Sequence, residues 1–90
     1  MNRIMAVCGS GLGSSFMVEM NVNEILSELG LNGFEVSHSS LADATADQAD
    51  IFITAKDLEP SASHLPNLIV LDALFDKDEL KVKLQEKLGC

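Results

Sequence analysis

Ninety residues with 47% hydrophobic content are enough for one compact domain and not for two, so residues 1–90 are expected to form a single domain. Six Lys and Arg against fourteen Asp and Glu give a formal net charge of -8 without any basic stripe, which excludes the electrostatic attraction behind nucleic-acid binding. The apolar runs, such as residues 68–71, are far shorter than the roughly 20 residues of a membrane span, and the N-terminus lacks a signal-peptide pattern, so a cytoplasmic location is expected.

The first predicted elements are a strand and a helix, joined by a loop rich in glycine and serine. Residues 3–7, RIMAV, form a nearly continuous apolar run, which is typical of a strand buried on both faces of a parallel sheet. A helix is predicted over residues 14–29, where apolar residues recur at the spacing of one helix face. These residues are Val18, Val22, Ile25, Leu26 and Leu29. We expect Ser14 or Ser15 to cap the start of this helix and Gly30 to end it.

Three further strands follow in the chain. Residues 34–38, FEVSH, alternate between apolar and polar side chains and predict a strand near the edge of the sheet. Residues 50–54, DIFIT, and residues 68–72, LIVLD, predict two more strands. Residues 41–49 are expected to be a short helical or irregular link, and residues 56–67 a connection broken by Pro60 and Pro66.

The last predicted element is a helix over residues 77–88. Asp76 and Glu79 stand in the spacing of a capping box at its start. The leucines that follow at helical spacing are expected to face the core. They are Leu80, Leu84 and Leu88.

Strands that alternate with helical or long connections predict an α/β fold. Because such crossovers are right-handed, we expect a small open four-stranded parallel sheet in the order 2-1-3-4, with helices on both faces. Ligands bind to such sheets beyond the carboxyl ends of the strands where the strand order reverses, here between the first and third strands. Cys8 is expected at this place, with residues 54–56 beside it.

The loop CGSGLGSS has the composition of an anion-binding cradle. Its glycines, Gly9, Gly11 and Gly13, permit positive φ and close backbone approach, and the helix that follows adds the positive end of its dipole. The same field favours the thiolate of Cys8, which is the nucleophilic form of cysteine. The expected donors are the backbone amides of Gly9, Ser10, Gly11, Leu12, Gly13, Ser14 and Ser15. The pattern alone leaves open the alternative that Cys8 is a buried core residue before a tight turn.

Three familiar glycine-rich or cysteine-containing loops each lack a required residue here. A dinucleotide-binding loop needs an acidic residue near the end of the second strand, where this chain has residues 37–39, SHS. A Walker A loop needs a lysine near the helix start, and no lysine precedes Lys56. A cysteine phosphatase of the C-x5-R type carries arginine where Ser14 stands. Without that arginine, hydrolysis of a thiophosphate is expected to be slow, which suits a protein that keeps a phosphoryl group until an acceptor arrives.

Further side chains are candidates for supporting roles. Lys56, at the end of the third predicted strand, is the nearest candidate cation for a bound anion or else an ordinary surface lysine. Phe16 and Met20 project away from the core stripe of the first helix, which predicts either a docking patch for a partner or packing against a loop. For His38 and His64, a surface or hydrogen-bonding role is expected.

No metal and no cofactor are expected. The two cysteines, Cys8 and Cys90, form no CxxC pair and show no metal-ligand spacing. Cys90 is the last residue of the sequence, which is a poor basis for a stabilising disulfide.

The stretch IMAVCGSGLGSSFMVEMNVNEIL resembles the N-terminal signature of the IIB components of the bacterial phosphoenolpyruvate-dependent sugar phosphotransferase system. It is most similar to the L-ascorbate type, in which a hydrophobic strand ends in Cys-Gly-x-Gly-x-Gly-Ser-Ser and a Met-rich helix follows. The similarity is specific over residues 3–29. After the third predicted strand, the segment ITAKDLEP departs from the ascorbate-type pattern.

This resemblance implies a cytosolic phosphocarrier that meets the inner face of the membrane through its transporter. Cys8 would take a phosphoryl group from a phosphohistidine on the IIA component and give it to the sugar delivered by the membrane-embedded IIC component. Galactitol-type and lactose/cellobiose-type IIB proteins share the fold and the cysteine, so the ascorbate prediction depends on the loop pattern alone. Two alternatives from other classes are a phosphatase-like enzyme of the low-molecular-weight type without its arginine, and an anion-binding module in which Cys8 only packs.

Overall fold

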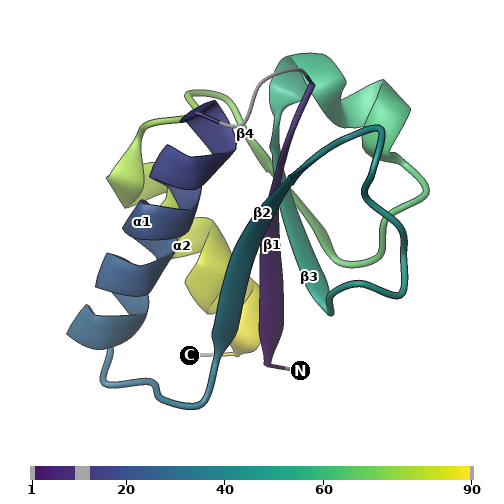
Figure 1. The fold of residues 1–90 in the computed structure, drawn as a ribbon. Coiled ribbons are helices and arrows are strands. Elements are labelled where there is room, and N and C mark those ends of the chain that lie inside the picture. Colours follow the sequence, from purple (N-terminus) through teal and green to yellow (C-terminus); the bar gives the residue numbers. More distant parts are fainter. Residues whose placement is uncertain (1, 10–12, 90) are drawn as a thin grey trace.

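The structure, a computed structural model, describes residues 2–9 and 13–89. Its elements in chain order are β1 (Arg3–Cys8), α1 (Gly13–Glu28), β2 (Glu35–Ser40), β3 (Ile51–Ala55), the 3₁₀ helix η1 (Lys56–Ala62), β4 (Leu68–Leu71) and α2 (Lys77–Leu88). The four strands form one parallel sheet in the order β2-β1-β3-β4 (Figure 1). The predicted α/β fold and its strand order are confirmed, and β2 lies at an edge as expected.

Strand pairing extends three strands beyond their predicted ends, β1 by one residue to Cys8. β2 continues to Ser40 because its register with β1 runs on to the pair Cys8 and Ser40. β3 likewise continues to Ala55, which pairs with Leu71 of β4. The serines at the end of β2 carry no apolar alternation, so only the neighbouring strand explains their extended conformation.

The two faces of the sheet are covered differently. Both α-helices pack on one face, and η1 together with the segment 41–50 covers the other (Figure 1). The fully buried residues of α1 and α2 include Val22, Ile25, Leu80 and Leu84, which confirms the predicted stripes. Helices thus lie on both faces, but a 3₁₀ helix containing Pro60 takes the place of an α-helix on the second.

The start of α1 differs from the prediction, whereas its end agrees. The helix begins at Gly13, so Ser14 and Ser15 lie inside its first turn and neither can be the N-cap. At the other end Gly30 has a φ of 70° and its N–H donates to the Ser27 carbonyl at 3.1 Å. A left-handed glycine at this position ends the helix as expected.

Only one of the two hydrogen bonds of the predicted capping box forms at the start of α2. Asp76 accepts a hydrogen bond from the Glu79 N–H at 3.1 Å, as predicted. The Glu79 carboxylate reaches back further, to the N–H groups of Asp72 at 2.8 Å and Ala73 at 3.1 Å, and it also accepts from Lys83 Nζ at 2.7 Å. The Lys83 hydrogen bond, followed by those two backbone donors, lowers the pKa of Glu79 to about 2. Glu79 therefore ties the start of α2 to the turn after β4.

Glu79→Gln is expected to lower the melting temperature at pH 7, and the difference from wild type should shrink in acid. A carboxyl whose pKa falls on folding contributes stability above its unfolded value, near 4.5, and loses it as the pH falls towards 2. Thermal unfolding between pH 7 and pH 2 measures this, with the exposed Glu86→Gln on the same helix as the control. A difference that stays constant across this range would contradict the assignment.

Candidate functional site

A cavity of about 310 Å³ opens at the carboxyl ends of β1 and β3, where the strand order reverses. Four segments line it: the end of β1, the first turn of α1, the start of η1 and the turn after β4. The lining residues are Cys8, Gly9, Ser14, Ala55, Asp57, Leu58 and Leu74. The prediction that Cys8 lies beside residues 54–56 is confirmed through Ala55.

Cys8 is held in place at the end of β1. Its carbonyl accepts a hydrogen bond from the Leu41 N–H at 2.6 Å, and the carbonyl before it, that of Val7, accepts from the buried Thr54 hydroxyl at 3.1 Å. The residue is 5% exposed, yet it lines the cavity. Strand pairing thus fixes the position of Cys8, and its thiol borders a cavity that can hold a small group.

The first turn of α1 lies against the thiol. Cys8 Sγ is 3.3 Å from the hydroxyl of Ser15, whose side chain is fully buried, whereas Ser14 lines the cavity. No acidic residue stands in this first turn, so no side chain of the turn itself offsets the positive end of the helix dipole at the cavity. The Cys8 S–H donates to the Ser15 hydroxyl oxygen, and the N-terminus of α1 makes the cavity a favourable place for a bound anion.

The described glycines of the loop, Gly9 and Gly13, do not adopt the positive φ that glycine permits. Positive φ among the described glycines occurs at Gly30, Gly33 and Gly89. Space at Gly9 is limited instead, because a Cβ there would lie 3.2 Å from Leu58 Cδ2, which would have to move by a few tenths of an ångström. A Cβ at Gly13 would meet nothing within 4 Å. Ser10, Gly11 and Leu12 lie outside the described residues, so their amides remain predicted donors.

Lys56 lies away from the cavity lining. Its ammonium is 3.9 Å from Asp72 Oδ1, and both side chains are more than two-thirds exposed. The next residue, Asp57, lines the cavity together with Leu58. The sequence pattern indicated the segment that follows the third strand, but nothing in it showed which side chain of a 3₁₀ turn faces the thiol.

Phe16 and Met20 are exposed by 47% and 42%, and Met17 adjoins them at 46%. The Phe16 ring also meets His38 edge-on at 5.6 Å between centroids, and His38 Nδ1 lies 2.6 Å from Glu19 Oε1. His38 therefore has the hydrogen-bonding role expected of it, and His64 is exposed. The three apolar side chains, Phe16, Met17 and Met20, form an apolar patch on the first half of α1.

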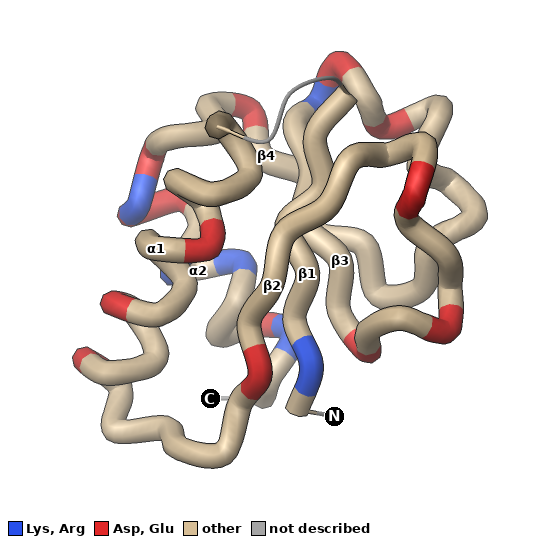
Figure 2. The backbone as a smooth tube through the Cα atoms, viewed as in Figure 1, with Lys and Arg blue, Asp and Glu red and all other residues tan. Residues whose placement is uncertain are grey.

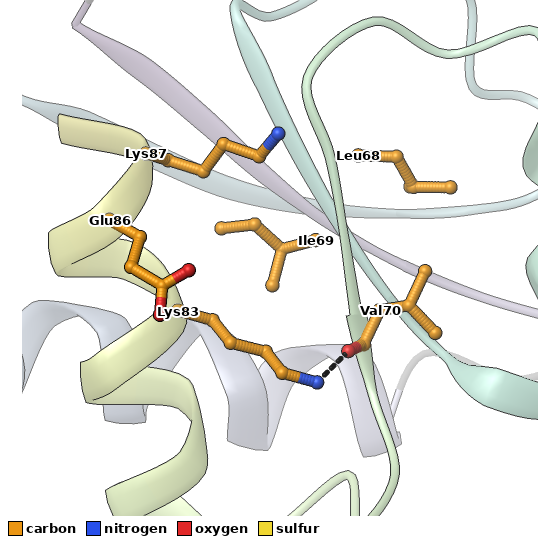
Figure 3. A pocket seen from close by; sticks show the side chains of 6 residues that line it. All are labelled: Leu68, Ile69, Val70, Lys83, Glu86 and Lys87. Atoms are coloured by element: carbon orange, nitrogen blue, oxygen red, sulfur yellow. Dashed lines mark hydrogen bonds between the residues drawn. The ribbon is translucent and has the colours of Figure 1, made fainter.

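A second cavity, of about 430 Å³, lies between β4 and α2 (Figure 3). Its charged lining residues are Lys83, Glu86 and Lys87. Lys83 is already engaged, because its ammonium donates to the Val70 carbonyl at 2.6 Å as well as to Glu79. The cavity shares no lining residue with the first and contains no nucleophile comparable with Cys8.

Acidic residues are spread over the surface, with red segments on α1, on η1 and in the segment 41–50 (Figure 2).

Across residues 2–9 and 13–89, no group of three or more His, Cys, Asp or Glu side chains is placed to hold a metal ion. Within the same residues, no helix has the length and apolar character needed to cross a bilayer.

The comparison with protein families matches residues 3–86 to the family described as PTS system, Lactose/Cellobiose specific IIB subunit. The match covers nearly the whole chain and supports the predicted IIB component, but its type is lactose/cellobiose and not the predicted L-ascorbate type. A search of curated proteins finds no match. A thiol at the end of β1, against a helix start and open to a cavity, agrees with a role in phosphoryl transfer. The chain therefore belongs to the PTS lactose/cellobiose-specific IIB subunit family and is a phosphocarrier component of a sugar phosphotransferase system.

Proposed function

We propose that Cys8 is the residue that carries the phosphoryl group. It accepts this group from a phosphohistidine on the IIA component and passes it to a sugar held by the membrane-embedded IIC component. The observation that supports this most directly is the position of the thiol, in the cavity at the strand-order reversal and 3.3 Å from the Ser15 hydroxyl. The protein would work in the cytoplasm and approach the membrane only through IIC.

The first half-reaction is the attack of the Cys8 thiolate on phosphorus. The S–P bond forms as the N–P bond breaks, and the electron pair of that bond remains on the imidazole of IIA. The transition state is loose and in line, with charge on the equatorial oxygens, so the protein mainly positions the group and stabilises charge. Backbone amides of residues 9–15 supply hydrogen bonds to these oxygens, each worth about 1.5–3 kcal/mol. In the structure the Cys8 S–H donates to the Ser15 hydroxyl oxygen. When the thiol loses its proton, the Ser15 hydroxyl turns and donates to the thiolate, before acceptance and after donation.

Two features suit a carrier better than a phosphatase. Ser14 stands where a C-x5-R phosphatase has its arginine, so charge on a transition state of hydrolysis is less well compensated. Lys56 does not take over that position: to reach the phosphoryl group it would first have to leave Asp72. We assign Lys56 at most a supporting role from the rim, with the amides and the α1 dipole carrying the stabilisation.

We propose L-ascorbate as the sugar, supported by the loop CGSGLGSS and the Met-rich helix that follows it. Phosphorylated protein should transfer its label to L-ascorbate in membrane vesicles that contain the matching IIC, and not to galactitol or cellobiose. Transfer to cellobiose instead would assign the chain to the sugar type in the family's printed description.

The apolar patch of Phe16, Met17 and Met20 is the proposed docking surface for IIA and IIC. It lies on the same half of α1 whose first turn contacts the thiol, so a partner that covers it would also reach the cavity. Exposed Met and Phe side chains are common in partner interfaces. The net charge of -8 favours partners with a positive rim around their reacting groups.

Incubation with phosphorylated IIA, followed by mass-spectrometric mapping of the label, tests the carrier role. A stable adduct on Cys8 is expected. Release of inorganic phosphate would assign a phosphatase, and the absence of any label would assign a module that only binds anions. Either of these two results would overturn the proposal.

A further inference from the structure

Asp57 is the one carboxylate among the described residues that line the Cys8 cavity. It lies in the first turn of η1, which follows β3 directly, whereas Cys8 ends the neighbouring strand β1. Because the carboxyl ends of neighbouring parallel strands meet at one edge of a sheet, Asp57 and the thiol border the same space from two sides.

The Asp57 carboxylate is unengaged within residues 2–9 and 13–89. No hydrogen bond or ion pair to it is present there, whereas the adjacent Lys56 pairs with Asp72, and neither of these two residues lines the cavity. A carboxylate without such a partner repels a bound dianion, and it also has free lone pairs that can accept a proton. The ability to accept a proton matters only when the phosphoryl acceptor is a hydroxyl group.

We propose that Asp57 is a catalytic residue, the general base of transfer from phospho-Cys8 to the sugar. This inference depends on the carrier role proposed above. The sugar hydroxyl oxygen forms the O–P bond as the S–P bond breaks, and the electron pair of the S–P bond returns to sulfur as the Cys8 thiolate. The hydroxyl proton passes to an oxygen of Asp57 and from there to water once the cavity opens. General bases of this kind contribute typically 10²–10⁴-fold, and a loose transition state places the effect towards the low end.

The return of the phosphoryl group from Cys8 to IIA can be compared with its transfer to the sugar, and this comparison tests the role of Asp57. Phospho-Cys8 can return its phosphoryl group to the IIA histidine, whose imidazole attacks through a nitrogen lone pair and has no proton to lose. A base therefore assists transfer to the sugar and not the return to IIA. A carboxylate that acts only through its negative charge alters both directions, because the same dianion is present in both.

The experiment measures single-turnover transfer from labelled phospho-Cys8 in the full chain, once to unlabelled IIA and once to L-ascorbate in IIC-containing vesicles. Asp57→Asn should lower the ratio of the sugar-transfer rate to the IIA-return rate by about 10- to 100-fold, because loss of the negative charge acts on both rates and loss of the base acts on sugar transfer alone. Glu59→Gln is the matched control, since Glu59 is an exposed acid of η1 outside the cavity lining, and both of its rates should stay within about twofold.

Every other outcome overturns the assignment. Equal slowing in both directions would make Asp57 a structural residue, and equal acceleration in both would reduce it to a source of repulsion. Unchanged rates in both directions would place the base on IIC. Failure of wild type to form phospho-Cys8 at all is a different result, because it removes the carrier role and not only the role of Asp57.

Discussion

Cys8→Ser is expected to abolish phosphoryl transfer to the sugar and to leave the fold intact. The serine hydroxyl would occupy nearly the same space beside Ser15 at the end of β1. Its oxygen is not ionised near neutral pH, so the group that attacks phosphorus is missing. Loss of a catalytic nucleophile costs on the order of 10⁴- to 10⁶-fold, which here means no labelled sugar above background.

Cys90→Ser is the matched control, because it changes the other cysteine of the chain in the same way. It should leave the transfer rate unchanged. Circular dichroism and thermal unfolding of Cys8→Ser should match wild type closely, which separates a lost nucleophile from a lost fold. Transfer that persists in Cys8→Ser would remove Cys8 as the carrier and return it to the alternative of a buried packing residue.

Phe52→Ala is expected to destabilise the protein by about 3–5 kcal/mol, the cost of a large cavity in a packed core. Phe52 is fully buried in β3 and packs on the face covered by η1 and the segment 41–50. That cover has few large apolar side chains, since Ala44, Ala49 and Ala62 supply much of it, so its collapse into the vacated space is limited. The free energy of unfolding of native domains is about 5–15 kcal/mol in total, so the variant would keep only a small part of it.

Equilibrium unfolding in urea measures this difference, and Phe75→Ala provides the control. Phe75 is 58% exposed, so its truncation should change stability by no more than about 0.5 kcal/mol. Equal effects of the two substitutions would show that the face under η1 contributes little to the core. The 3₁₀ helix η1, which covers this face of the sheet, also carries Asp57 and Leu58 of the Cys8 cavity. Phe52→Ala should therefore also lower the rate of phosphoryl transfer in the molecules that remain folded.

The sequence determined most of the architecture through local rules. Apolar runs and helical spacing predicted β1, α1 and α2 nearly residue by residue, because burial on one face imposes a period that single residues report. The right-handedness of crossovers then predicted the order β2-β1-β3-β4, and the reversal in that order predicted the position of Cys8.

What the sequence left undetermined depends on contacts between distant segments. The length of β2 follows from pairing with β1, and the burial of Ser15 follows from its contact with Cys8 and not from helix capping. Lys56 and Asp57 are neighbours in the chain, and their roles differ because one points to Asp72 and the other to the cavity. Local patterns determine which elements form, because backbone periodicity is a property of a few consecutive residues. Only the packed fold determines which side chain in a short turn faces the thiol, because that direction is decided by groups from other strands.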